Sequence, residues 1–125
     1  YPADPTKRVI FGQSLGGQFV LYAALAEPDL FYGHVASNPA LHRNLEFFVD
    51  EKWRDIQSSG DSRLFVSDGA KDDPRFREPF LEWQNYWSVQ TAAPWRLKIE
   101  TLDDQSHFSA APEAFRRGMR WIFGE

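Results

Sequence analysis

Cysteine is absent from this 125-residue sequence, and so are an excess of positive charge and long apolar runs. Without cysteine the chain forms neither a disulfide framework nor a thiolate metal site, although its compartment stays undetermined. Lys and Arg number 14 against 18 Asp and Glu, and the net charge of -4 argues against a broad nucleic-acid or anionic-membrane surface. No apolar run approaches the roughly 20 residues that span a bilayer. We therefore expect neither nucleic acid nor a membrane as partner.

Short apolar runs alternate with helix-like segments along the chain. The runs at 8–11, 34–37, 63–67 and 96–102 predict four buried strands. The segments between them are long enough for crossover helices, and Pro112 and Gly124 mark the start and end of a last helix. Such alternation predicts an α/β fold, with a parallel sheet and helices on both of its faces. With 42% hydrophobic residues and no linker, residues 1–125 are expected to form a single domain.

Apolar side chains at helical spacing predict which helix faces pack on the sheet. Aromatic residues make up 16% of the chain, including five Trp, which could suggest an aromatic-ligand platform. Their spacing favours core packing instead, and the charged run at 50–55 is typical of a solvated helix face. The predicted buried sets are Leu15, Phe19, Tyr22 and Ala26; Phe47, Phe48 and Trp53; Phe76, Phe80, Trp83 and Trp87; and Phe115, Met119 and Ile122.

A serine lies between glycines where the first strand gives way to a helix, in the sequence Gly12-Gln13-Ser14-Leu15-Gly16. A dinucleotide fingerprint would need glycine at position 14, and a phosphate-binding P-loop would need lysine after the last glycine, so neither fits. The G-x-S-x-G spacing at a strand-to-helix turn fits a nucleophile elbow. In that motif the glycines relieve collisions between Cβ atoms, and the serine backbone is strained. The amide of Leu15, at the helix N-terminus, would then face an oxyanion.

A serine nucleophile needs a base, and the chain has three histidines. His107 follows the last strand and precedes the last helix, which places it at the same sheet edge as Ser14. His42 follows the second strand on that edge and is a weaker candidate, more for a pocket residue than for the base. His34 opens its strand at the opposite edge and is expected to be a surface or core residue. We therefore predict His107 as the base.

The acid that orients the base is sought after the third strand. Asp72 completes a Gly-x-x-Asp pattern beyond a turn that we expect Asp68 to form, and it is the preferred acid. Asp73, which precedes Pro74, is a close alternative. Asp103 and Asp104 share a loop with His107 and would have to fold back on it. The order Ser14, Asp72, His107 is the chain order of triads in α/β hydrolases. No metal-ligand spacing is present, and we expect no metal or cofactor.

The segment from Arg8 to Leu41, the Gly-x-x-Asp turn and the segment from Ser106 to Phe123 together resemble an esterase family of α/β hydrolases that includes enterochelin-esterase-like siderophore hydrolases. The resemblance spans nearly the whole chain. It implies that Ser14, His107 and Asp72 are nucleophile, base and acid. It also implies that Gln13, Asn38, Leu41 and His42 lie near the pocket as substrate contacts.

The same resemblance implies that the chain matches strands five to eight of the usual sheet, the C-terminal half of an α/β-hydrolase fold. The family carries further strands before the elbow, and one of their loops supplies a second oxyanion amide. We therefore expect an N-terminal segment upstream of residue 1, or self-association of the chain through its unpaired first strand.

The predicted function is that of a serine hydrolase that cleaves a small-molecule carboxylic ester through a Ser-His-Asp triad and an acyl-enzyme. The alternative is a noncatalytic binding or scaffold module with the same fold. The complete set of three residues favours the enzyme.

Overall fold

The computed structural model describes residues 4–124. Four parallel strands form one sheet in the order β1-β2-β3-β4, namely β1 (Val9–Gln13), β2 (Gly33–Ser37), β3 (Arg63–Gly69) and β4 (Arg96–Leu102). The strands begin and end within two residues of the predicted positions. The register pairs Gly12 with Ala36 and Ser67 with both Ser37 and Glu100. All four strands therefore end at one edge of the sheet, where the loops that follow them gather.

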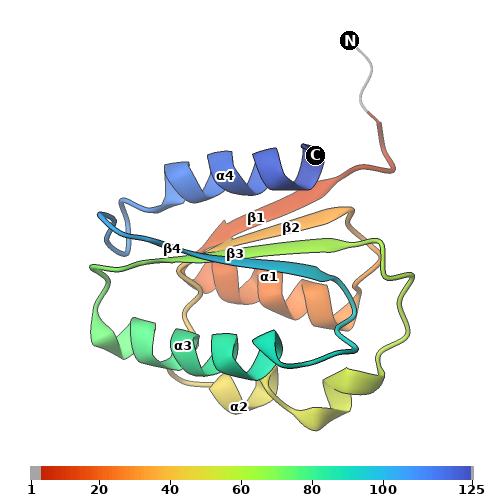
Figure 1. The fold of residues 1–125 in the computed structure, drawn as a ribbon, viewed down its shortest axis with the longest axis horizontal. Coiled ribbons are helices and arrows are strands. Elements are labelled where there is room, and N and C mark those ends of the chain that lie inside the picture. The colour runs from red at the N-terminus through yellow and green to blue at the C-terminus, as the bar shows by residue number, and fades with distance from the viewer. Residues whose placement is uncertain (1–3, 125) are drawn as a thin grey trace.

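Helices cover both faces of the sheet, which confirms the predicted layers (Figure 1). On one face lies α4 (Ala111–Phe123), which packs on β2 and β3. On the other face lie α1 (Leu15–Ala26) and α3 (Pro74–Ser88), with α2 (Leu45–Phe48) packed against α3 and followed by the 3₁₀ helix η1 (Glu51–Asp55). No helix within the described part of the chain is long and apolar enough to cross a membrane.

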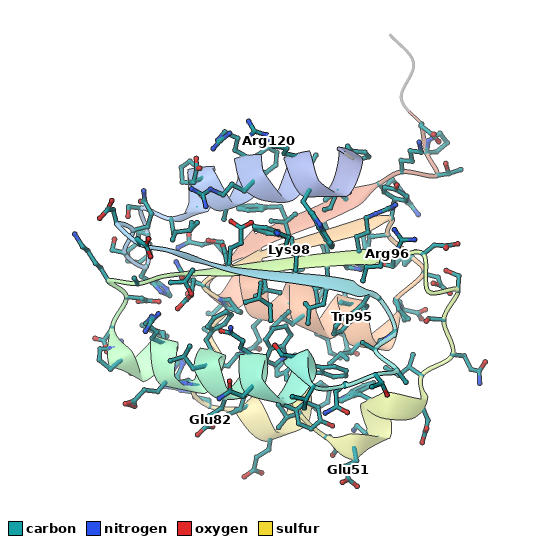
Figure 2. All side chains as sticks on the ribbon, viewed as in Figure 1. Glu51, Glu82, Trp95, Arg96, Lys98 and Arg120 are labelled. Atoms are coloured by element: carbon teal, nitrogen blue, oxygen red, sulfur yellow. The ribbon has the colours of Figure 1, made fainter. Side chains whose placement is uncertain are left out.

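The main core lies between the sheet and the layer of α1, α2 and α3, and tryptophans fix its geometry. Trp95 donates its indole N–H to the carbonyl of Ala24 at 2.8 Å, and Trp87 donates to Phe48 at 2.9 Å. Both rings are almost completely buried, so these bonds satisfy polar atoms that would otherwise be costly to bury. Figure 2 shows Trp95 on the α1 side of the sheet and Lys98 on the α4 side. Trp87 thus packs in the core, as predicted from its spacing.

The predicted inner face of α1 is wrong. Leu15, Phe19 and Tyr22 are 69%, 59% and 45% exposed, whereas Val20 and Leu21 are buried. This helix carries apolar residues nearly all around its axis, so helical spacing alone did not define a unique buried face.

The predicted inner face of α4 is wrong as well, apart from Ile122, which is buried as expected. Phe115 is 45% exposed, and the helix instead turns the small residues Ala114 and Gly118 toward the sheet. A Cβ on Gly118 would lie 2.8 Å from the side chain of Val35, so glycine permits this close approach. A search for large apolar residues could not find a face made of small ones.

β1 forms an edge of the sheet among the described residues, and apolar surface lies beside it. Phe11 on β1 is 36% exposed and meets the ring of Phe115 edge-on at 5.3 Å. Edge strands with exposed apolar side chains promote association between chains. Self-association of the chain therefore stays a prediction, and this edge is where we expect it.

His34 is buried in the core at the amino ends of the strands, far from the loops that follow them. Its Nδ1 lies 3.3 Å from the carbonyl oxygen of Arg63 and 3.2 Å from the hydroxyl of Ser62. Burial disfavours the imidazolium and lowers the pKa of His34 from 6.5 to about 4. The histidine therefore belongs to the packing of the fold.

Because the unfolded chain gains the His34 proton at a higher pH than the folded chain does, acid should destabilise the protein through this residue. The stability is complete above pH 6.5 and is lost as the pH falls toward 4. We expect the free energy of unfolding to drop by about 2 kcal/mol between pH 7 and pH 5 from this group. In His34→Gln, the free energy of unfolding measured with urea should drop by about 2 kcal/mol less than in wild type between pH 7 and pH 5. His42→Gln, at an exposed histidine, should keep the wild-type drop, and an unchanged drop in His34→Gln would contradict the assignment.

Candidate active site

Ser14 sits at the turn between β1 and α1 in a backbone conformation that L-residues rarely adopt. Its φ is 60° and its ψ is -115°, which agrees with the strain expected of a nucleophile elbow. Its backbone N–H donates to the carbonyl of Ser37 at 3.0 Å, and its own carbonyl accepts from Gln18 and Ala40 at 3.0 Å each. These bonds hold the turn against the end of β2 and fix the direction of the side chain.

The glycines at the elbow differ in how much space their surroundings leave for a side chain. A Cβ on Gly12 would lie 2.2 Å from the carbonyl oxygen of Gly16, so a side chain at position 12 is excluded, as expected. A Cβ on Gly16 would meet nothing within 4 Å, so the predicted collision does not apply to that residue. Gly17 is the second tight position, because its Cβ would lie 3.1 Å from both Pro39 and Ser37. The close packing of the elbow therefore depends on Gly12 and Gly17.

Three of the residues singled out in the sequence meet above the elbow. The Oγ of Ser14 lies 2.8 Å from Nε2 of His107, and Nδ1 of His107 lies 2.9 Å from Oδ2 of Asp72. The side chain of Asp72 is 2% exposed and that of His107 is 12% exposed. Three loops, after β1, β3 and β4, therefore bring a hydroxyl, an imidazole and a carboxylate into one hydrogen-bonded chain.

The two neighbouring aspartates have separate partners. Oδ1 of Asp72 accepts the backbone N–H of Asp73 at 2.7 Å, which orients the carboxylate toward His107. The side chain of Asp73 instead caps α3 by accepting the N–H of Arg75 at 2.8 Å. The structure thus brings Asp72 to the imidazole and uses Asp73 at the helix N-terminus. Asp103 and Asp104 are exposed in the loop after β4.

Asp68 does not form the predicted turn. It is buried at the end of β3, where it accepts the hydroxyl of Thr101 at 2.8 Å and pairs with Arg77 of α3 at 2.9 Å. Burial raises the pKa of this carboxyl, while Thr101 and Arg77 act in the opposite direction. The turn that carries Asp72 begins at Gly69, whose carbonyl accepts the Asp72 N–H at 3.0 Å. Asp68 therefore ties β3 to β4 and α3.

A cavity of about 420 Å³ opens beside Ser14 and His107. Phe76, predicted as helix core, lies at this cavity with its ring stacked on that of His107 at 4.4 Å. Phe108 meets the same imidazole edge-on at 5.1 Å and is 77% exposed. Phe76 lies in the first turn of α3, next to the carboxyl ends of the strands. That position indicates a place at the cavity, whereas helical spacing alone assigned Phe76 to the core. Lys71 and Arg75 also line the cavity.

The residues that the resemblance placed near substrate have varied positions. His42 is exposed and meets Phe76 edge-on at 5.1 Å, which puts it next to the cavity. Leu41 is 0% exposed in the main core, so the structure does not bring it to the site. Gln13 and Asn38 donate their side-chain amides to the backbone carbonyl of His107. Leu15 begins α1, so its N–H is among those without a partner inside the helix.

Among the described residues, no group of three or more His, Asp or Glu is arranged to hold a metal ion.

A parallel sheet with helices on both faces and a serine presented at a strand-to-helix turn defines the α/β-hydrolase class of fold. Within that class the chain belongs to the esterase family, since the family model described as "Putative esterase" matches residues 1–117.

Known proteins similar to this chain include esterases and hydrolases. The ferri-bacillibactin esterase BesA of Bacillus subtilis (strain 168) is 43% identical over 49 residues, which make up 39% of this chain and 17% of that protein. The IroE-like serine hydrolase from Shewanella oneidensis superposes with a TM-score of 0.81 at 15% identity, over 94% of this chain and 40% of that one. The siderophore hydrolase EstA from Aspergillus nidulans gives a TM-score of 0.73 at 21% identity, over 93% and 47%. This chain thus spans less than half the length of each of these proteins.

Proposed function

We propose that this chain carries the active site of a serine carboxylesterase. The observation that supports the proposal is the hydrogen-bonded chain from Ser14 Oγ through His107 to Asp72, with distances of 2.8 and 2.9 Å. A buried carboxylate beside Nδ1 favours the tautomer that carries its proton on Nδ1. Nε2 then presents its lone pair to the hydroxyl of Ser14, which is the arrangement that a serine nucleophile needs.

In the proposed first half-reaction the Oγ of Ser14 attacks the carbonyl carbon of the ester, and its proton passes to Nε2 of His107. The carbonyl oxygen becomes an oxyanion, which the N–H of Leu15 at the start of α1 stabilises. The intermediate collapses when the C–O bond to the alcohol breaks. His107 returns the proton to the leaving oxygen, and the acyl group remains on Ser14.

In the second half-reaction a water molecule gives its proton to His107 and attacks the acyl carbon. The bond to Ser14 Oγ then breaks, the hydroxyl regains its proton from Nε2, and the carboxylic acid leaves. Asp72 keeps its hydrogen bond to Nδ1 and stabilises the imidazolium in both halves. The net reaction adds one water to one ester and needs no cofactor.

The ring of Phe76 stacks on the imidazole of His107 at 4.4 Å, which helps to hold that ring beside Ser14. The names of several relatives point to siderophore esters as a substrate class. The substrate class that we propose for this chain is a carboxylic ester.

An acyl-enzyme distinguishes the esterase from a noncatalytic module of the same fold. Mixing the protein with an excess of p-nitrophenyl acetate should release a burst of about one p-nitrophenolate per active site before a slower steady rate. Mass spectrometry of acid-quenched protein should find one acetyl group on the peptide that contains Ser14. A linear time course with acetyl groups spread over lysines would show surface chemistry only and would favour the noncatalytic alternative.

A further inference from the structure

The backbone carbonyl of His107 is held by two side-chain amides from distant parts of the chain. Asn38 donates its Nδ2 to this oxygen at 2.7 Å, and Gln13 donates its Nε2 to the same oxygen at 2.5 Å. A carbonyl oxygen has two lone pairs and accepts two hydrogen bonds without competition. The base is therefore fixed through its main chain as well as through its ring.

Asn38 is built into the site as a buried residue. It is 2% exposed, and its φ of 44° lies in the left-handed region, which asparagine enters more readily than most residues. Its Oδ1 accepts the N–H of Gly69 at 2.7 Å, while its Nδ2 also lies 3.3 Å from the carbonyl of Ser106. One amide group thus joins the end of β3 to the loop that carries His107.

The two amides link the chain segments that carry Ser14, His107 and Asp72. Gly69, which Asn38 holds, opens the turn that ends at Asp72. Gln13 directly precedes Ser14 in the chain. Asn38 therefore links the turn of the acid to the loop of the base, and Gln13 links the strand of the nucleophile to the same loop.

We propose that Asn38 and Gln13 are positioning residues for His107, and that neither contacts the substrate. The inference rests on the proposed function, because it assigns these amides to the alignment of the Ser14, His107 and Asp72 groups. Without the two amides the carbonyl of His107 would lack hydrogen-bond donors at a partly buried position. The loop would then shift until this carbonyl found water or another donor. A misplacement of about 1 Å between reacting groups costs about 10²-fold in rate.

The test replaces each amide by a carboxylate of the same shape. Asn38→Asp keeps the acceptor for Gly69 but faces the carbonyls of Ser106 and His107 with an oxygen in place of a donor. We expect its kcat for p-nitrophenyl butyrate, and its rate of labelling by a fluorophosphonate probe, to fall about 10²-fold. Gln13→Glu should lower both about tenfold, and the KM should stay within about twofold in each variant.

Gln90 offers a matched control. Its Nε2 donates to the carbonyl of Tyr86 at 2.9 Å, which is the same type of bond, just beyond the end of α3 and without contact to His107. Gln90→Glu should keep kcat and the labelling rate within about twofold of wild type. The double variant Asn38→Asp/Gln13→Glu should lose less than the product of the single losses, because both amides hold one oxygen.

Proton NMR of the His107 ring supplies a readout that a loss of stability alone would not move. In folded wild type the Nδ1 proton should be protected from exchange by Asp72 and give a downfield signal, and Asn38→Asp should broaden or remove it. If Asn38→Asp does not fold, Gln13→Glu carries the test alone with the same two readouts. Raised KM values with unchanged kcat, or unchanged labelling and an unchanged Nδ1 signal, would overturn the proposal. Failure of the proposed function would appear separately, as wild-type protein that the probe does not label.

Discussion

Replacing Ser14 with alanine should abolish ester hydrolysis and fluorophosphonate labelling together. The hydroxyl is the one group of the site placed to attack a carbonyl, at 2.8 Å from the imidazole that would take its proton. Loss of the nucleophile from a serine triad costs about 10⁶-fold in kcat in the best-studied case. The measurement is the turnover of a short-chain p-nitrophenyl ester, compared with in-gel fluorescence after reaction with the probe.

Ser106→Ala is the matched control for this experiment. Ser106 lines the same cavity, and its hydroxyl lies 3.1 Å from that of Ser109 and not beside the imidazole. This variant should keep labelling at Ser14, as located by peptide mapping. Labelling that survives in Ser14→Ala would show that this serine is not the nucleophile and that the probe reacts with another residue.

Changing Asp72 to asparagine should have the second largest effect, although the shape of the side chain hardly changes. An amide in place of the carboxylate donates to Nδ1 of His107, so the ring proton moves to Nε2. Nε2 then has no lone pair with which to accept the proton of Ser14. The corresponding exchange in the serine-protease triad lowers kcat about 10⁴-fold. We expect a loss of similar size in the turnover of p-nitrophenyl butyrate, measured at pH 7 with labelled active sites as the reference.

Asp73→Asn separates the two neighbouring carboxylates. Asp73 caps α3, and asparagine is about as good a cap, so both turnover and stability should stay near wild type. A large loss in Asp73→Asn with little loss in Asp72→Asn would assign the acid role to Asp73. Thermal unfolding of both variants provides the check that each one folds.

The features that could be predicted from the sequence are those set by local patterns. A strand buried on both faces is a short apolar run, and β2 and β3 were recognisable for that reason. The elbow is equally local, since the close approach of Gly12 to Gly16 and the strain at Ser14 lie within five consecutive residues. The fold class followed from the alternation of strands and helices alone.

The features that the sequence did not reveal depend on partners far along the chain. The amide of Gln13 meets a carbonyl 94 residues away, and that of Asn38 meets one 69 residues away. Asp68 resembled a turn residue because its partners, Thr101 and Arg77, belong to other elements. Helix faces were misassigned where small residues, such as Gly118, make the contact. The periodicity of apolar residues and the conformational propensity of each residue report on positions close in sequence. They cannot identify contacts between residues that are distant in sequence and close in space.

The backbone of Ser14 carries a cost that selection would act on. A non-glycine residue in such a conformation costs about 1–3 kcal/mol of folding free energy, which glycine at the same position would largely recover. Natural domains are stable by only about 5–15 kcal/mol, so this is a noticeable share. A population of variants chosen for thermal stability alone would drift toward glycine at position 14, and one chosen for catalysis would retain serine. With Ser14 as the proposed nucleophile, heat resistance and chemistry therefore place opposite demands on this one residue.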